Sequence, residues 1–219
     1  MSILHFSSVL QAWPLFLDGL WLTVVLTIVS CFLGTVLGIF CAWSRIHGAA
    51  WLRIGVACYV EVFRNTPFLV QIFFIYFGLP SLGLKLNSVT ASVVSLTLNL
   101  GAYACEIVRA GIEATPRGQI EAAESLALNR WHVFTRVVIP PALARIWSGL
   151  SSQLVIMLLA SALCSQISAA ELSYAANFIA GKTFRSFESY IVVTGCYLVL
   201  AIALRGCLKW LGLQFIFGR

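Results

Sequence analysis

Residues 20–44 read LWLTVVLTIVSCFLGTVLGIFCAWS, a run without one charged side chain. A helix that crosses a membrane needs about 20 consecutive apolar residues. Similar uncharged runs recur at 86–105, 146–170 and 189–204, and one more, at 65–84, is interrupted by Pro67. These runs predict an all-helical integral membrane protein with five transmembrane helices.

The composition supports the same conclusion. Of the 219 residues, 60% are hydrophobic and 10% are charged, and the mean hydropathy is +0.95. Soluble domains carry roughly 25% charged residues, because polar side chains must cover their core. The chain has too few polar residues for that, which excludes a soluble domain.

The five spans are expected at about 20–43, 54–79, 87–108, 146–170 and 189–208. Proline removes a helical hydrogen bond, so the second span is expected to be bent or broken at Pro67. Gly34 and Gly38 have the small-xxx-small spacing that lets two helices approach closely. Residues 171–188 are expected to form an outer loop or a short helix. Because the first 19 residues contain no Lys or Arg, the first span is expected to be retained rather than cleaved as a signal peptide.

The basic residues predict the orientation. Ten of the 14 lie in three alternate segments, namely after the first span, between the third and fourth, and after the fifth. They are Arg45, Arg53, Arg109, Arg117, Arg130, Arg136, Arg145, Arg205, Lys209 and Arg219. Lys and Arg are enriched on the cytoplasmic side of membrane proteins. We therefore expect the N-terminus outside and the C-terminus in the cytoplasm, and we attribute the net charge of +6 to orientation rather than to nucleic-acid binding.

No motif indicates an enzyme or a metal site. The seven cysteines lie mostly inside apolar runs and form no Cys-x-x-Cys pair. Residues 181–183, GKT, resemble the end of a phosphate-binding loop, but Ala176 occupies the position where that loop needs Gly. The sequence therefore predicts a protein without catalytic residues, metal ligands or a cofactor of its own.

The long polar segment, residues 109–145, is rich in helix formers but contains turn-forming residues at Pro116, Gly118, Pro140 and Pro141. This pattern predicts helical pieces separated by turns rather than one long helix. Residues 118–127 are expected to form one short helix, and residues 130–138 a second with an apolar face. Such helices either offer a docking surface to a cytosolic partner or rest on lipid head groups.

Residues 118–127, GQIEAAESLA, followed by Arg130-Trp131 and by VVIP at 137–140, resemble the cytoplasmic EAA loop of binding-protein-dependent ABC importer permeases. Three further stretches resemble the polar amino-acid branch of these permeases, which serves histidine, glutamine, glutamate, arginine and opines. They are EVFRNTPFLVQ at 61–71, FFIYFGLP at 73–80, and Ala102-Tyr103 with EIVRAGI at 106–112. The resemblance covers residues 18–206.

The resemblance implies the type I ABC importer permease fold: a single transmembrane domain, 1–219, with its core at about 18–208. A cytoplasmic EAA coupling loop, here called the coupling segment, would occupy about 112–141. The implied partners are an ABC ATPase dimer that holds ATP and magnesium, a second permease subunit (identical or related) and an outer amino-acid-binding protein, all at a bacterial inner membrane with its lipid. The residues implied in ATPase coupling are Gly118, Glu121, Ala122, Ala123, Leu126, Ala127, Arg130 and Trp131.

The chain departs from the family pattern at two places. Ala127 stands where the family usually has Gly. If that position needs a positive φ, Ala costs roughly 1 kcal/mol or more, and Asn129 is an alternative site for the left-handed turn. Residues 159–163 read LASAL, where many relatives have Lys-Asp-Thr-Ser-Leu, so a charged pair is missing.

Polar groups inside the spans are candidates for a substrate path, because an ionisable residue there costs around 2.5 to 3.5 kcal/mol. Glu61 and Arg64 are three residues apart and can pair on one helix face. One interpretation is that they line the route of a charged amino acid. The other is a structural ion pair that holds the broken helix. The candidate path residues are Glu61, Arg64, Thr66, Gln153 and Ser161.

Two other functions stay open at this point. One is a self-sufficient dimeric channel or secondary transporter, with two copies joined through Gly34 and Gly38. The other is a structural or assembly protein without a path. The EAA-like segment favours the importer permease, because a channel needs no ATPase docking helix.

Overall fold

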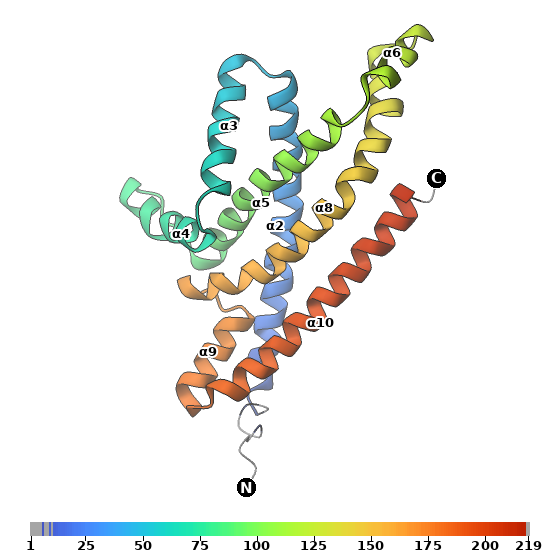
Figure 1. Ribbon diagram of the computed structural model, residues 1–219. Helices are drawn as coiled ribbons and strands as arrows, with labels where there is room; N and C mark the ends of the chain where they lie inside the picture. Colours follow the sequence, from blue (N-terminus) through green and yellow to red (C-terminus); the bar gives the residue numbers. More distant parts are fainter. Residues whose placement is uncertain (1–5, 7–8, 10, 218–219) are drawn as a thin grey trace.

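The computed structural model describes residue 6, residue 9 and residues 11–217, and the regular structure of these residues is helical (Figure 1). Four helices are long and apolar enough to cross a membrane, and a broken helix pair raises the number to five. The predicted all-helical membrane protein is therefore confirmed, with the broken pair as its unusual span.

The central helix pair is α2 (Trp13–His47) and α5 (Ser88–Glu113), which pack closely along their lengths. Gly34 and Gly38 are buried in this contact. A Cβ atom at Gly38 would overlap the Cβ of Ala104 and lie 3.0 Å from the backbone nitrogen of Cys105. The glycine spacing thus joins two helices of one chain, and the alternative in which it joins two copies is wrong.

Helix α2 is longer than the predicted span of 20–43. It has 35 residues and begins with Pro14 in its first turn, where the missing N–H has no helical partner to lose. Trp21 and Trp43 lie on its surface, with 69% and 52% of their area exposed. The apolar run therefore marked only the middle of this helix.

The second span is broken. Helix α3 (Ala50–Arg64) is followed by α4 (Phe68–Phe73) and by two short helices of other types, η1 (Phe74–Gly78) and η2 (Leu79–Leu82). The two halves meet at 111°, and α4 turns away sideways from α3 (Figure 1). Pro67 disfavours helical geometry at the residue before it, which ends α3. The predicted break is confirmed.

The polar segment contains α6 (Arg117–Ser125) and α7 (Arg130–His132). After α7 the helix continues without a gap through the π-helix η3 (Val133–Val138), α8 (Ile139–Ala160) and the 3-10 helix η4 (Ser161–Ile167). The expected interruption at Pro140 and Pro141 is wrong. Both prolines follow the wider π turn and lie at the start of α8, where their missing N–H groups break no regular α-helical ladder.

The chain ends with α9 (Leu172–Thr183), α10 (Ser186–Gly212) and η5 (Leu213–Phe217). Helix α9 confirms the short helix predicted within 171–188. Figure 1 shows α6 and the α2–α3 turn at one end of the molecule, with α9 and the start of α2 at the other. The basic residues around the α2–α3 turn and between α5 and α8 therefore lie at the same end of the molecule.

Candidate functional site

The coupling segment is fixed to the bundle where α5 ends. Pro116, with extended backbone, caps the start of α6. Arg145 of α8 donates a hydrogen bond of 2.7 Å to the carbonyl of Ala114, one residue beyond α5. This bond satisfies a carbonyl that has no helical partner at a helix end. The turn from α5 into α6 is thus held by α8.

The end of α6 is a Schellman turn. The amide of Ala127 donates to the carbonyl of Glu124 at 2.9 Å, and that of Leu128 donates to Ala123 at 3.3 Å. This turn needs a left-handed residue, and Ala127 has φ +56°. Asn129 does not take over: its backbone is extended and its side chain caps α7 by accepting the amide of His132. The sequence left two candidates for the left-handed residue, Ala127 and Asn129, and the structure places it at Ala127.

Relieving this strain gives a direct prediction. Ala127→Gly is expected to stabilise the α6–α7 loop by about 1 kcal/mol, because Gly adopts positive φ without the Cβ clash. Slower hydrogen–deuterium exchange of the amides around 123–129 is the readout. Ala122→Gly, in the interior of α6, is the matched control. It should destabilise the helix by about 1 kcal/mol and so make amide exchange faster. Faster amide exchange in Ala127→Gly would refute the hypothesis that the backbone of Ala127 is strained.

The α6 side chains divide into a buried anchor and an exposed surface. Ala123 is buried, on the helix that packs against η3. The other residues predicted to couple are exposed, and two of them are large apolar side chains, Leu126 at 76% and Trp131 at 70% exposure. Apolar side chains presented in this way on a polar segment are typical of a surface that another protein covers.

The break between α3 and α4 is held by Gln71, which sequence reasoning missed. Its side-chain amide donates to the carbonyl of Phe63 at 2.8 Å, and to the carbonyl and hydroxyl of Thr66 at 3.0 and 2.9 Å. Asn99 of α5 donates to the Gln71 oxygen at 2.9 Å. These bonds satisfy backbone groups that the break leaves without helical partners. The signal in the sequence was the presence of two side-chain amides, Gln71 and Asn99, within apolar runs.

The predicted Glu61–Arg64 pair is absent from the ion pairs of the described residues. Glu106 of α5 instead binds Arg45 of α2 and Arg109, and lies 3.9 Å from Arg64 of α3. Glu61 accepts a hydrogen bond of 2.8 Å from Asn65. A single carboxylate therefore connects three helices near the break.

The candidate path residues occupy two separate places. Arg64 lies over the ring of Tyr103, 5.5 Å from its centre, and the Thr66 hydroxyl donates to the carbonyl of Val62. Gln153 and Ser161 are buried on α8 and η4, where Ser161 donates to the carbonyl of Leu158. Among the described residues, no hydrogen bond or ion pair links these two groups.

A fully buried carboxylate, Glu171, is a second feature that the sequence did not reveal. It caps α9 by accepting the amide of Tyr174 at 2.9 Å, and it also accepts hydrogen bonds from Thr23 of α2 and Tyr197 of α10. Gly19 allows α2 to touch the Glu171 backbone. Burial raises the pKa of the Glu171 carboxyl above its ordinary value of 4.5. Glu171 thus connects α2, α9 and α10 through hydrogen bonds at the end of the molecule opposite α6.

The raised pKa of Glu171 predicts a pH-dependent stability. A group whose pKa is higher in the folded than in the unfolded protein contributes its full stability at pH values below the unfolded pKa. This contribution is lost as the pH rises through the folded pKa. Glu171→Gln should therefore gain thermal stability relative to the wild type as the pH increases. Thermal unfolding in detergent across a pH series measures this, with Asp18→Asn as the exposed control. Parallel curves for Glu171→Gln and the wild type would contradict it.

Residues 34–213 match the family model described as binding-protein-dependent transport system inner membrane component. The match includes α5, the coupling segment, α8 and α9. The chain belongs to this family. As an inner membrane component of a transport system, it is a transport subunit rather than a catalytic one.

Relatives of this inner membrane component include two bacterial permeases. It is 33% identical over 188 residues to the probable amino-acid ABC transporter permease protein YckA of Bacillus subtilis (strain 168), covering 86% of this chain and 83% of that protein. It is 33% identical over 206 residues to the glutamine transport system permease protein GlnP of Escherichia coli (strain K12), covering 93% and 94%.

Solved structures agree with the helical arrangement of the inner membrane component. A crystal structure of an amino acid ABC transporter with histidines matches with a TM-score of 0.88 and 36% identity, over 94% of this chain and 97% of that one. An inward-facing structure of the MetNI methionine ABC transporter matches with a TM-score of 0.69 at 22% identity, over 94% and 96%. The second likeness supports the fold alone. The family match, the two permeases and the 36%-identical amino acid transporter favour an ABC permease over a self-sufficient channel.

Proposed function

We propose that this chain is the permease subunit of an ABC importer for polar or charged amino acids in a bacterial inner membrane. The amino-acid permeases among its relatives support the substrate class. The coupling role rests on the structure of α6: Ala123 is buried, whereas Glu121 and Ala122, and Leu126 directly after the helix, are exposed.

The partners follow from this role. A separate ATPase dimer, which binds ATP and magnesium, docks on α6 from the cytoplasm. A second permease subunit completes the translocation path, and an outer binding protein delivers the amino acid at the α9 end. The N-terminus lies outside and the C-terminus in the cytoplasm, as the basic segments predict.

The coupling segment has a mechanical connection to the membrane. Helix α6 packs against η3, and η3 continues as one helix into α8 and η4. A displacement of α6 by a closing ATPase dimer is therefore transmitted along one helix, from Arg130 to Ile167. Helices shift as rigid bodies more easily than they stretch. A continuous helix from the coupling segment into the membrane therefore suits a transporter that alternates between inward-open and outward-open states.

The substrate route runs past the broken span, where Glu61, Arg64 and Thr66 lie, and past Gln153 and Ser161 on the α8 side. Arg64 is the cation with the largest exposed share among the three that face Glu106, since 40% of its side chain is exposed. We assign it to the carboxylate of the passing amino acid, with Glu106 holding it in place.

Arg64→Ala is expected to lower amino-acid uptake several-fold while the transporter still assembles, because a charged contact of the substrate is lost. Initial uptake rates in proteoliposomes, with KM and maximal rate separated, test this. Arg53→Ala, on the same helix and exposed, is the matched control, and Glu61→Gln examines the neighbouring carboxylate. Normal kinetics in assembled Arg64→Ala would leave only a structural role for the arginine.

Reconstitution tests the function as a whole. The permease, its ATPase and its binding protein are placed in liposomes, and uptake of labelled glutamine, histidine, glutamate and arginine is measured. We expect uptake that needs ATP and the binding protein, with one or a few amino acids preferred. Uptake by the permease alone, driven by a gradient, would establish the channel or secondary transporter instead.

A further inference from the structure

Two adjacent cavities lie between the end of α2 and the coupling segment. The first, of about 460 Å³, opens among α2, α6, α7 and η3. The second is a groove of about 670 Å³ along α2, α5, η3 and α8. Trp43, His47 and Phe134 line both, so the cavities are neighbours. We call the pair the amphipathic site.

The groove is apolar along its length. Its lining consists of aliphatic and aromatic side chains such as Phe40, Ile139 and Leu143, and His47 is its one ionisable lining residue. Its volume lies in the range of ligand pockets, about 300–1,000 Å³. The groove is formed by helices that belong to membrane spans. A hydrocarbon chain is the ligand that such a groove accepts.

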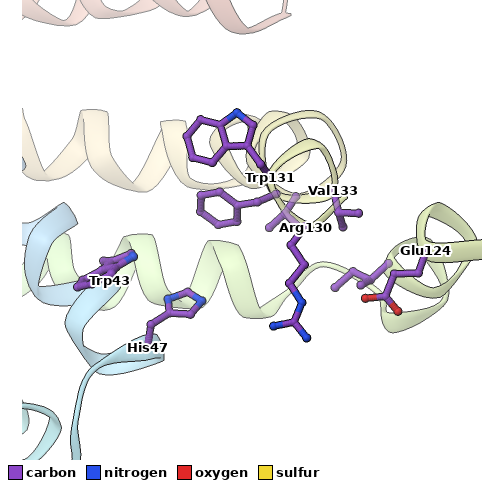
Figure 2. A pocket seen from close by; sticks show the side chains of 9 residues that line it. Trp43, His47, Glu124, Arg130, Trp131 and Val133 are labelled. Atoms are coloured by element: carbon purple, nitrogen blue, oxygen red, sulfur yellow. The ribbon is translucent and has the colours of Figure 1, made fainter. Parts of the chain in front are cut away.

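The mouth of the site carries one charge of each sign. Figure 2 shows the Arg130 side chain reaching into the space between His47 and Glu124. Among the ion pairs of the described residues, neither Arg130 nor Glu124 takes part. Trp43 of α2 also lines the mouth, and tryptophan is enriched where a membrane meets water. A ligand at this mouth meets a guanidinium and a carboxylate together.

We propose that the amphipathic site binds one glycerophospholipid with a primary-amine head group, with an acyl chain in the groove, the phosphate on Arg130 and the ammonium on Glu124. A phosphate alone would satisfy Arg130 and meet repulsion from Glu124. A trimethylated amine cannot donate a hydrogen bond to the carboxylate. The ethanolamine class supplies both partners. The bound lipid then bridges α2 and the coupling segment.

Native mass spectrometry of the full chain tests the proposal, using phosphatidylethanolamine, phosphatidylcholine and phosphatidylglycerol with identical acyl chains. We expect phosphatidylethanolamine to bind about tenfold more tightly than the other two, which corresponds to one charge-assisted hydrogen bond. Glu124→Gln should remove the preference over phosphatidylcholine while leaving phosphatidylcholine binding intact. Equal binding of the three lipids, or a preference for phosphatidylglycerol, would overturn the proposal.

The groove is tested separately. Leu143→Trp fills it and should reduce the binding of each lipid several-fold, since the acyl chain loses its space. Leu159→Trp is the matched control, because Leu159 lies on the same helix with a similar exposure, 48% against 42%, outside the groove lining. Equal lipid binding by the two folded variants would refute the groove as the acyl-chain site.

Discussion

Glu121→Lys is expected to reduce ATP-driven uptake at least about tenfold without lowering the amount of permease in the membrane. Glu121 is exposed on the anchored helix α6, so its replacement leaves the bundle intact and changes only the proposed docking surface. Reversing a charge at a docking surface costs several kcal/mol, and about 1.4 kcal/mol is a factor of ten. Uptake and ATPase activity in proteoliposomes measure the effect.

Asp18→Lys is the matched control for ATPase docking and ATPase activity in this experiment. It makes the same change of charge on an exposed residue near the start of α2, at the end of the molecule opposite α6. Co-purification of the ATPase with each permease variant separates weaker docking from slower transport. Full uptake and stimulated ATPase activity in Glu121→Lys would show that α6 does not dock the ATPase through this face.

Gly38→Ala is expected to destabilise the protein by about 1–3 kcal/mol, the usual range for overpacking a well-packed contact. The added methyl group would meet the Cβ of Ala104 and the backbone of Ala104 and Cys105, which cannot rotate away. Helices α2 and α5 would have to separate along the central contact of the bundle. The thermal midpoint of the purified variant measures this loss.

Two other glycines provide a graded comparison. At Gly34 the new methyl group meets Cβ, Cγ and Cδ2 of Leu100 at 2.8–2.9 Å, against 2.4 Å to the Cβ of Ala104 at Gly38. Because this overlap is smaller and the Leu100 Cγ and Cδ2 atoms can move, a smaller loss is expected. At Gly195 on α10 nothing lies within 4 Å, and Ala is expected to be neutral or slightly stabilising because it favours a helix. A Gly38→Ala variant as stable as Gly195→Ala would contradict the tight α2–α5 contact.

The apolar runs predicted the number and order of the spans, because the membrane demands a fixed length of hydrocarbon-compatible helix. They did not predict where helices end. Helix α2 extends beyond its apolar run at both ends, and the helix containing α8 begins at Arg130 rather than at Ile146. Helix ends outside the membrane depend on caps and turns, which a hydropathy pattern does not contain.

Proline gave opposite outcomes at two places. Pro67 ends α3 and coincides with a bend of 111°, whereas Pro140 and Pro141 lie in a continuous helix. The difference comes from the neighbouring backbone: Gln71 satisfies the groups freed at Pro67, and a π turn precedes Pro140. These compensations come from residues and backbone outside the proline itself, so a local reading of the sequence cannot separate the two cases.

The short helix α6 and the turn after it could be predicted because they lie in one contiguous motif, and the strained Ala127 followed from a single departure within that motif. The role of these residues in ATPase coupling stays a prediction. The partners of the membrane charges could not. Glu106 attracts arginines from α2 and α3, and Glu171 collects hydroxyl groups from α2 and α10, so both sites depend on how distant helices cross. Spacing along one helix suggested Glu61 as the partner of Arg64, but the tertiary packing selected Glu106.

Two of the exposed tryptophans of α2 have a consequence for the choice of membrane. Trp21 and Trp43 are 22 positions apart, which is about 33 Å along an α-helix. Tryptophan anchors at the boundary between acyl chains and head groups, so this spacing matches a hydrocarbon layer of roughly 30 Å when α2 is only slightly tilted. In thinner bilayers α2 must tilt further, and its tilt carries Gly34, Gly38 and the α5 helix packed on them. The length of the lipid acyl chains is thus expected to change the tilt of α2 and, with it, the position of the helices packed on α2.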